Sequence, residues 1–229
     1  MIFTKKDFFL SRILKKNCYN LSSLKNSYKN IYLKKNIFLT LKSKNLRDLK
    51  IIKNFKKKNN FKFIDYELVF RGNVKFKIDR LNCEIAKKND KKKIMEISKS
   101  ELKLNRFGID NKISSKICSK IKQSWVKNYF KNKRGDLLVI NKYKSQITGF
   151  LLVIKKKNIM IVDLIAVSKK YKRKKIALKM IIFAQELLFK GQNLVQAGTI
   201  SSNHSAKRFY KKIGLKMFSK RSIFHYHSN

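Results

Sequence analysis

The chain has 229 residues, which is enough for one domain of ordinary size together with a smaller unit. Lys and Arg number 58 against 13 Asp and Glu, so the formal net charge is +45, and proline is absent. Such an excess usually indicates a nucleic acid or an anionic membrane surface as a partner. Here the lysines are spread along the whole chain, and Asn and Ile are also abundant. We therefore attribute the charge to a compositional bias and expect no specific nucleic acid partner.

The cysteines and the apolar runs limit where the protein works and what it binds. Cys18, Cys83 and Cys118 are widely spaced and form no C-x-x-C pair, which argues against a disulfide framework or a zinc site. No apolar run approaches the roughly 20 residues of a membrane span, and residues 1–16 lack the apolar core of a signal peptide. We expect a cytoplasmic protein without a membrane span and without a metal.

Residues 1–75 are expected to form a small α/β unit. Its predicted elements, from apolar alternation and spacing, are a strand at 8–14, a strand at 37–40, a helix within 46–55 and a strand at 61–70. A turn at Gly72 and Asn73 then marks the expected boundary, so a second domain is predicted over 76–229.

The second domain opens with alternating strands and helices. In chain order, the predicted elements are a strand at 83–85, a helix within 94–104, a polar loop at 106–110, a helix within 117–130, and a hairpin of strands 137–140 and 146–155. The order of these elements, and not any one of them, is the informative feature.

The most informative stretch runs from residue 162 to residue 215. Residues 162–167 are apolar except for Asp163, which predicts a nearly buried strand. After a basic turn, six apolar side chains recur at helical spacing: Ile176, Met180, Ile181, Ala184, Leu187 and Leu188. They predict about three turns of helix, ending near Gly191. A strand that leads through a tight turn into a helix directs backbone N–H groups and the positive end of the helix dipole at one point, which attracts a phosphate.

A second helix carries the spacing Asn203, Ala206, Tyr210 and Gly214. Steps of three and four residues put the first three on one helix face. In order and spacing, the strand, the turn and the two helices resemble the acetyl-CoA site of the GNAT family of N-acetyltransferases. The resemblance implies an α/β (α+β) fold, namely the GNAT fold with a mixed central sheet flanked by helices, preceded here by the small α/β N-terminal unit.

The resemblance also implies a co-substrate, acetyl-CoA, and residues that bind it. Backbone groups at the end of the strand would pair with the pantetheine arm and the acetyl carbonyl: Ile165, Ala166 and Val167. The family's turn of the form Q/R-x-x-G-x-G/A would hold the pyrophosphate: Lys172, Arg173, Lys174, Lys175, Ile176 and Ala177. Lys175 stands where the family usually has glycine. Asn203 would bind the CoA arm.

Tyr210 would be the general acid that protonates the departing CoA thiolate, since a phenol with a pKa of about 10 keeps its proton at neutral pH. An amine acceptor arrives largely as ammonium, so a base is also required. Asp163 is the candidate base, and the alternative is a structural buried aspartate. Arg106 and Asp110 lie in the loop that would approach the acceptor, where a basic residue suits a nucleotide diphosphate.

Within the family, the chain resembles the sugar-nucleotide N-acetyltransferases, such as dTDP-fucosamine acetyltransferases. The likeness lies in the order of segments along nearly the whole chain: 5–9, 61–70, 105–110, 145–153, 163–167, 197–203 and 219–227. The expected partner is therefore a small-molecule amine acceptor, an amino-sugar nucleotide used in surface polysaccharide synthesis. The oligomeric state is left open, with a homodimer as one option.

Two other functions are kept as alternatives. One is an N-acetyltransferase of proteins or of other amines. The protein N-acetyltransferases that resemble this chain usually have a Glu five residues before the Asn of the second helix, and this chain has Gly198 there. The other is a basic, nucleic-acid-associated protein with a degenerate GNAT fold and no activity. The charge and Lys175 favour that second alternative, whereas the intact spacing of Asn203 and Tyr210 favours the enzyme.

Overall fold

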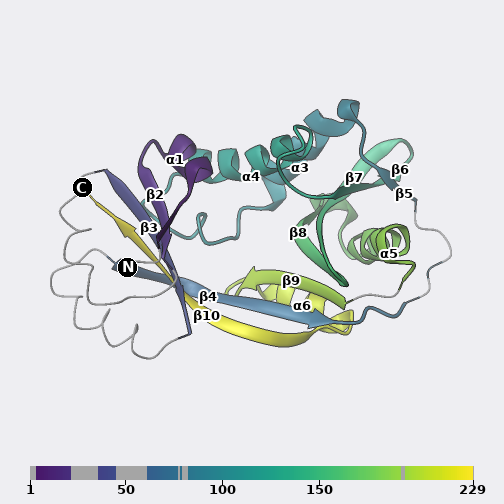
Figure 1. Cartoon of the computed structure of the whole chain (residues 1–229). Coiled ribbons are helices and arrows are strands. Elements are labelled where there is room, and N and C mark those ends of the chain that lie inside the picture. Colours follow the sequence, from purple (N-terminus) through teal and green to yellow (C-terminus); the bar gives the residue numbers. More distant parts are fainter. Residues whose placement is uncertain are drawn as a thin grey trace.

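The computed structural model describes residues 4–21, 36–44, 61–76, 78, 82–191 and 194–228. Within them, one mixed sheet of 10 strands has the order β1-β2-β3-β10-β4-β9-β8-β7-β6-β5 (Figure 1). The strands are β1 (Thr4–Lys6), β2 (Asn17–Leu21), β3 (Ile37–Ser43), β4 (Phe61–Gly72), β5 (Cys83–Ile85), β6 (Leu137–Tyr143), β7 (Gln146–Lys156), β8 (Ile159–Val167), β9 (Leu194–Ile200) and β10 (Lys216–His227). Neighbours are antiparallel, apart from the parallel pairs β2–β3 and β8–β9.

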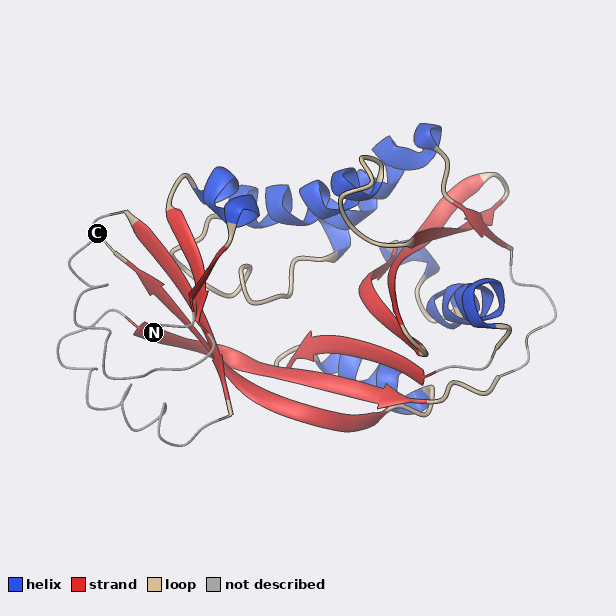
Figure 2. Ribbon diagram, in the orientation of Figure 1, coloured by secondary structure: helices blue, strands red, loops and turns tan. Residues whose placement is uncertain are grey.

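Helices cover both faces of this sheet, as the prediction required (Figure 2). They are α1 (Phe8–Leu14), α3 (Lys91–Glu101), α4 (Ser115–Tyr129), α5 (Ile176–Phe189) and α6 (His204–Lys212), with short 3-10 helices η2 (Lys88–Asp90) and η3 (Lys169–Tyr171). Alternate residues of β7 belong to two clusters, so the clusters lie on opposite faces. Ile94 of α3 and Val126 of α4 lie in one cluster, and Met180 of α5 and Tyr210 of α6 lie in the other. None of the described helices has the length and apolarity needed to cross a bilayer.

β8, the nearly buried strand predicted at 162–167, contains a β-bulge. Its register with β7 shifts at Asp163, which is the extra residue of the bulge. Before the bulge, Met160 and Val162 pack in the cluster with α5; after it, Leu164 and Ala166 pack in the cluster with α3 and α4. The bulge therefore exchanges the faces to which the side chains of β8 point.

The predicted strand at 8–14 is wrong, because these residues form α1. The carboxylate of Asp7 caps the helix by accepting a hydrogen bond from the backbone N–H of Leu10 at 2.8 Å. Leu10 and Ile13, three residues apart, are both buried, and Lys15 ends the helix in the left-handed conformation. A capped amphipathic turn of helix therefore replaces the expected strand.

The other predicted elements within the described residues are found. The predictions at 37–40, 61–70 and 83–85 are confirmed as β3, β4 and β5, and the predicted hairpin is β6 and β7. The helices α4, α5 and α6 are also confirmed. α3 ends at Glu101, so the helix predicted within 94–104 is shorter than expected. The helix predicted within 46–55 lies outside the described residues.

The predicted boundary near residue 75 stays a prediction, and the sheet runs across it. β4, from the first unit, pairs with β9 on one side and with β10 on the other. β10, the last strand of the chain, also pairs with β3. The N-terminal strands and the rest of the chain thus share one hydrogen-bonded sheet.

Candidate functional site

β8 and β9 are parallel neighbours that separate toward their carboxyl ends (Figure 1). Their pairing runs only as far as Val162 with Ala197, whereas β8 continues to Val167 and β9 to Ile200. Along 163–167, no described strand pairs with the edge of β8 that faces β9. Main-chain N–H and C=O groups need partners, so this edge can hydrogen-bond an extended ligand. It contains the three residues predicted to meet the pantetheine arm.

The basic turn after β8 is exposed from Lys172 to Lys175. Arg173 and Lys175 have φ angles of 64° and 57°, in the left-handed region that glycine adopts without strain. Lys175 therefore holds the backbone conformation for which the resembled family has glycine, at a cost of roughly 1–2 kcal/mol. α5 begins at Ile176 without a side-chain cap, so its first backbone N–H groups point toward the turn without a capping partner.

The cations of this turn are not equivalent. The ammonium of Lys172 lies 2.7 Å from a carboxylate oxygen of Glu101 at the end of α3. The ammonium of Lys174 lies over the ring of Tyr171, 5.7 Å from its centre. The charge of Lys172, which is predicted to hold pyrophosphate, is thus already paired with the carboxylate of Glu101. The uncapped backbone N–H groups at the start of α5 are therefore better candidates for binding the phosphate than the Lys172 side chain.

The two predicted residues of this segment, Asn203 and Tyr210, lie at the N-cap of α6 and within α6, and the backbone N–H of Asn203 donates to the carbonyl of Ile200 at the end of β9. The side-chain oxygen of Asn203 accepts a hydrogen bond from the backbone N–H of Ala206 at 3.1 Å and caps the helix. Tyr210 is 3% exposed and packs in the same cluster as Val162 and Ala197, the last pair before the strands part. Burial raises the pKa of the Tyr210 phenol, so the hydroxyl keeps its proton through the neutral range.

Asp163 has a partner that its local sequence does not indicate. The Nε and Nη2 atoms of Arg134 donate to the two carboxylate oxygens of Asp163, both at 2.6 Å. Such a bidentate pair is the strong form of a charged hydrogen bond. The Asp163 side chain is 11% exposed. Because both oxygens are occupied, the geometry resembles a structural ion pair, and the assignment of Asp163 as the base stays a prediction.

Arg106 lies in the loop between α3 and α4, as predicted, and reaches the N-terminal part of the sheet. Its Nη1 donates to the hydroxyl of Thr40 on β3 at 2.8 Å, and its guanidinium lies 4.2 Å from the centre of the Phe107 ring. Burial lowers the pKa of Arg106 to about 10. The guanidinium is held at a defined position and makes no ion pair with a described carboxylate.

Glu67 of β4 is the acidic group whose charge acts most on Arg106. Its carboxylate is already occupied, since Lys42 of β3 donates to it at 2.5 Å and Arg221 of β10 donates to its other oxygen. Although burial raises the pKa of Glu67, these two cations hold it below its ordinary value. The sequence alone does not reveal this triad of Glu67, Lys42 and Arg221, because its three members come from strands that are distant in the chain.

Asp110 lies inside the protein, with 1% of its surface exposed. One carboxylate oxygen accepts hydrogen bonds from Nδ1 of His225 at 2.7 Å and Nε2 of His227 at 2.8 Å, and the other accepts one from the backbone N–H of Lys112 at 3.0 Å. Burial alone would raise the pKa of Asp110, but these hydrogen bonds hold it well below its usual range. The predicted contact of Asp110 with the acceptor stays a prediction, and this geometry gives it no support.

The same three side chains offer an arrangement that could hold a metal ion. The ligand atoms of Asp110, His225 and His227 all lie within 4.8 Å of one another. Their hydrogen bonds already account for the grouping, because both imidazoles donate to the same carboxylate oxygen. Burial also lowers the pKa of His225 to about 4, so its ring is neutral at pH 7. The prediction that the protein needs no metal stays a prediction.

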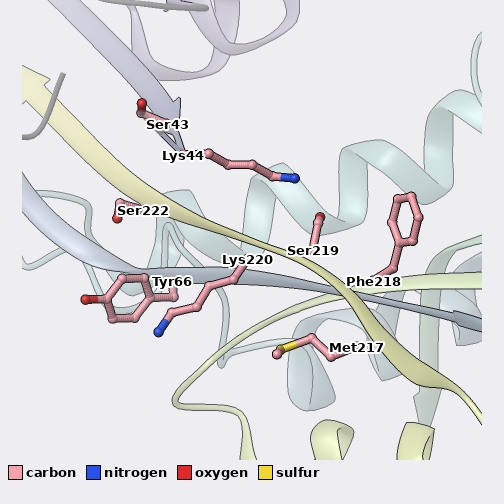
Figure 3. A pocket seen from close by; sticks show the side chains of 8 residues that line it. All are labelled: Ser43, Lys44, Tyr66, Met217, Phe218, Ser219, Lys220 and Ser222. Carbon is pink, nitrogen blue, oxygen red and sulfur yellow. The ribbon is translucent and has the colours of Figure 1, made fainter. Parts of the chain in front are cut away.

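A cavity of about 460 Å³ lies elsewhere on the sheet (Figure 3). Its walls are Ser43, Lys44, Tyr66, Met217, Phe218, Ser219, Lys220 and Ser222. It follows the part of β10 that extends beyond the pairing with β3. None of the residues predicted to bind acetyl-CoA or the acceptor lines it, so it is separate from the candidate site.

Two comparisons place the chain among known sequences. Residues 100–226 match the family model of the acetyltransferase (GNAT) domain. The spore coat polysaccharide biosynthesis protein SpsD of Bacillus subtilis (strain 168) is 25% identical over 139 residues, which is 60% of this chain and 47% of SpsD. The chain therefore spans about half the length of this curated relative.

Solved structures share the fold at low sequence identity. A functionally unknown conserved protein from Staphylococcus epidermidis ATCC 12228 superposes with a TM-score of 0.68 at 12% identity, covering 100% of this chain and 96% of that one. A GCN5-related N-acetyltransferase from Sphaerobacter thermophilus superposes with a TM-score of 0.59 at 9% identity, covering 97% and 74%. At such identities the likeness concerns the fold alone.

Proposed function

Since the chain belongs to the GNAT family of acetyltransferases, we propose that this acyltransferase moves the acetyl group of acetyl-CoA directly onto the amine of an amino-sugar nucleotide. The observation that carries the proposal is the separation of β8 and β9 beyond Val162 and Ala197, beside the uncapped start of α5. An extended thioester arm can pair with the open edge of β8, while its pyrophosphate meets the first N–H groups of the helix.

In the proposed reaction, the ammonium of the acceptor gives a proton to Asp163 or to water, and the free amine attacks the acetyl carbon. The nitrogen loses its second proton to the same group when the amide forms. A backbone N–H group within Ile165–Val167 stabilises the oxyanion of the tetrahedral intermediate. As the carbon–sulfur bond breaks, the phenol of Tyr210 donates its proton to the departing thiolate. The raised pKa of Tyr210 keeps that proton available at neutral pH. The reaction needs no covalent enzyme intermediate.

The acceptor class rests on three supports. The chain resembles sugar-nucleotide N-acetyltransferases over several segments, and the curated relative at 25% identity is named for spore coat polysaccharide biosynthesis. Arg106, fixed by Thr40 and Phe107, offers a positioned guanidinium for a phosphate. An amino sugar linked to a nucleotide diphosphate combines the amine and the phosphates that such a site would take.

Isothermal titration with acetyl-CoA at moderate salt tests the cofactor site. We expect saturable binding by the wild type, retained binding in Tyr210→Phe, and weaker binding in the double variant Asn203→Ala with Tyr210→Phe. Lys207→Ala, on the same helix, is the matched control and is expected to bind like the wild type. Absence of acetyl-CoA binding, together with salt-dependent binding of DNA or RNA, would favour the non-enzymatic alternative instead.

A further inference from the structure

Lys122 of α4 is a buried lysine with no acidic partner among the residues that the structure describes. Its exposed fraction is 9%, and its ammonium lies 4.0 Å from the centre of the Trp125 ring. No hydrogen bond or ion pair joins it to another described residue. Most lysines of this chain can be explained by composition and solvent exposure. A buried and unmatched ammonium is costly, so Lys122 calls for a different explanation.

Two arginines surround the same place. The guanidinium of Arg134 lies 4.3 Å from the centre of the Trp125 ring, so this indole contacts both Arg134 and Lys122. Burial lowers the pKa of Lys122 to about 7, and the next largest contribution is the positive charge of Arg106. The Phe107 ring that Arg106 contacts packs in the same apolar cluster as Trp125. Arg106, Lys122 and Arg134 thus form a basic cluster in which Lys122 is buried and both arginines are partly exposed.

The carboxylates near the basic cluster already have other partners: Asp163 has Arg134, Glu67 has Lys42 and Arg221, Asp110 has His225 and His227, and Asp7 accepts hydrogen bonds from the backbone of Leu10 and the amide of Asn20. Of the basic cluster, only Arg134 therefore has an acidic partner among the described residues. Arg106 and Lys122 make no ion pair with a described carboxylate, and an anion bound between them would favour the charged form of Lys122.

We propose that Arg106 and Lys122 form an anion-binding subsite that receives the diphosphate of the acceptor. The inference rests on the proposed function, because it assigns a place to the nucleotide part of that acceptor. In a nucleoside diphosphate sugar, each phosphate carries one negative charge, so the ligand supplies the two counter-charges that this pair lacks. The guanidinium of Arg106 offers a planar fork of donors, and the ammonium of Lys122 offers a point charge.

The position of this subsite fits the acetyl site. Arg134, whose guanidinium shares the Trp125 ring with Lys122, holds Asp163 at the bulge of β8. Asp163 precedes by two residues the stretch Ile165–Val167 that is proposed to hold the acetyl group. A diphosphate bound at Arg106 and Lys122 would therefore anchor the acceptor on the α4 side of the bulge and leave its sugar amine to reach the acetyl carbon.

Trp125 is the only tryptophan of the chain and lies beside Lys122, so its fluorescence can report on the subsite. The probe is inorganic pyrophosphate, titrated at about 0.15 M salt into protein that is already saturated with acetyl-CoA, which keeps the turn at 172–177 occupied. We expect a saturable change in Trp125 emission for the wild type. In Lys122→Met and in Arg106→Gln, we expect affinity for pyrophosphate to fall on the order of tenfold or more, as for the loss of a charged hydrogen bond.

The matched control is Lys127→Met, which removes an exposed lysine from the same helix and is expected to bind pyrophosphate like the wild type. Lys122→Met removes a buried unmatched charge, so we expect it to unfold at no lower temperature than the wild type. A lack of saturation in wild-type protein that binds acetyl-CoA, or equal affinities of wild type and Lys122→Met, would overturn the subsite. Failure of the proposed function has a different signature, because the protein would then not bind acetyl-CoA.

Discussion

Two regions of the molecule differ in whether their polar groups find hydrogen-bond or charge partners within the protein. In the matched region, Asp110 is saturated by two imidazole N–H groups and one backbone N–H group. In the open region, no described strand pairs with the β9-facing edge of β8 along 163–167, Lys175 holds a left-handed backbone, and Lys122 makes no ion pair with a described acidic residue. The Asp110 carboxylate is satisfied without a ligand, although Nε2 of the buried His225 has no hydrogen-bond partner among the described residues. The open region, in contrast, gains its missing partners from a ligand. We infer that the first supports stability and the second supports binding.

The largest expected effect on stability is in the matched region. Asp110→Ala would leave the ring N–H groups of His225 and His227 without their acceptor, and each unsatisfied buried donor costs about 1–3 kcal/mol of unfolding free energy. Urea unfolding followed by circular dichroism measures the loss. Glu96→Ala is the control, because the Glu96–Lys93 pair is more than half exposed and we expect a loss below about 1 kcal/mol. Equal losses in the two variants would contradict the contrast between the regions.

The matched region should also make stability depend on pH. Burial lowers the pKa of His225 to about 4, whereas the unfolded chain takes up this proton near pH 6.5. Between these values the unfolded state binds more protons, so the free energy of unfolding falls as the pH is lowered from about 6.5 to about 4, by up to about 3 kcal/mol. Asp110, whose folded pKa is depressed, adds a further loss at still lower pH.

Urea unfolding of the wild type and of His225→Gln at a series of pH values between 4.5 and 7 checks this dependence. The groups that face His225 are Asp110, His227 and Arg106, and they remain in the variant. The variant should show a clearly weaker slope over this range. Parallel slopes would mean that His225 titrates in the folded protein as it does in the unfolded chain.

The ion pair of Arg134 and Asp163 is expected to have an effect on stability between those of Asp110 and Lys175. Arg134→Gln would leave the carboxylate of Asp163 without its bidentate partner, and we expect a loss of about 2 kcal/mol, reduced because the Arg134 side chain is 28% exposed. Asp163→Asn distinguishes a structural role from a base. If Asp163 is structural, the two variants should lose similar stability while the pH profile of kcat keeps its shape. A lost acidic limb in Asp163→Asn alone would identify Asp163 as the base.

The smallest expected effect is at Lys175 in the open region. Lys175→Gly removes the strain of a left-handed lysine, so we expect a gain of about 1 kcal/mol in unfolding free energy and no weaker binding of acetyl-CoA. Thermal unfolding and titration with acetyl-CoA measure the two quantities. Lys174→Gly, one residue earlier and without a positive φ, is the control and should gain no stability. A destabilised Lys175→Gly would show that the side chain itself holds the turn.

The elements around the open region were predictable because their signals are local. The apolar run of β8, the helical spacing in α5, and the steps between Asn203 and Tyr210 each lie within one short segment. The apolar residues at 8–14 are by themselves compatible with the predicted strand, whereas the cap at Asp7 favours the helix α1 that the structure shows.

The charge network could not be predicted in the same way, because its partners are distant in the chain. Asp110 and His225 are separated by 115 residues, and Arg134 and Asp163 by 29. Lys122 did leave a local signal: it lies four residues after Cys118 and four before Val126, both buried on α4. In a chain with 58 basic residues, a single lysine on a helix does not by itself indicate a binding site. Only its position on the apolar face of α4 distinguishes Lys122 from the other lysines.

Acetyl transfer by the wild type and by Tyr210→Phe tests the central claim most directly. Both proteins would be saturated with acetyl-CoA and given a panel of UDP- and dTDP-linked amino sugars, with release of free CoA followed over time. The account predicts transfer by the wild type, and in Tyr210→Phe a kcat lower by about 10²–10⁴ with acetyl-CoA affinity unchanged, as expected for loss of a general acid. Equal kcat values in the two proteins would contradict the role of Tyr210, and no transfer to any member of the panel by wild type that binds acetyl-CoA would contradict the proposed acceptor.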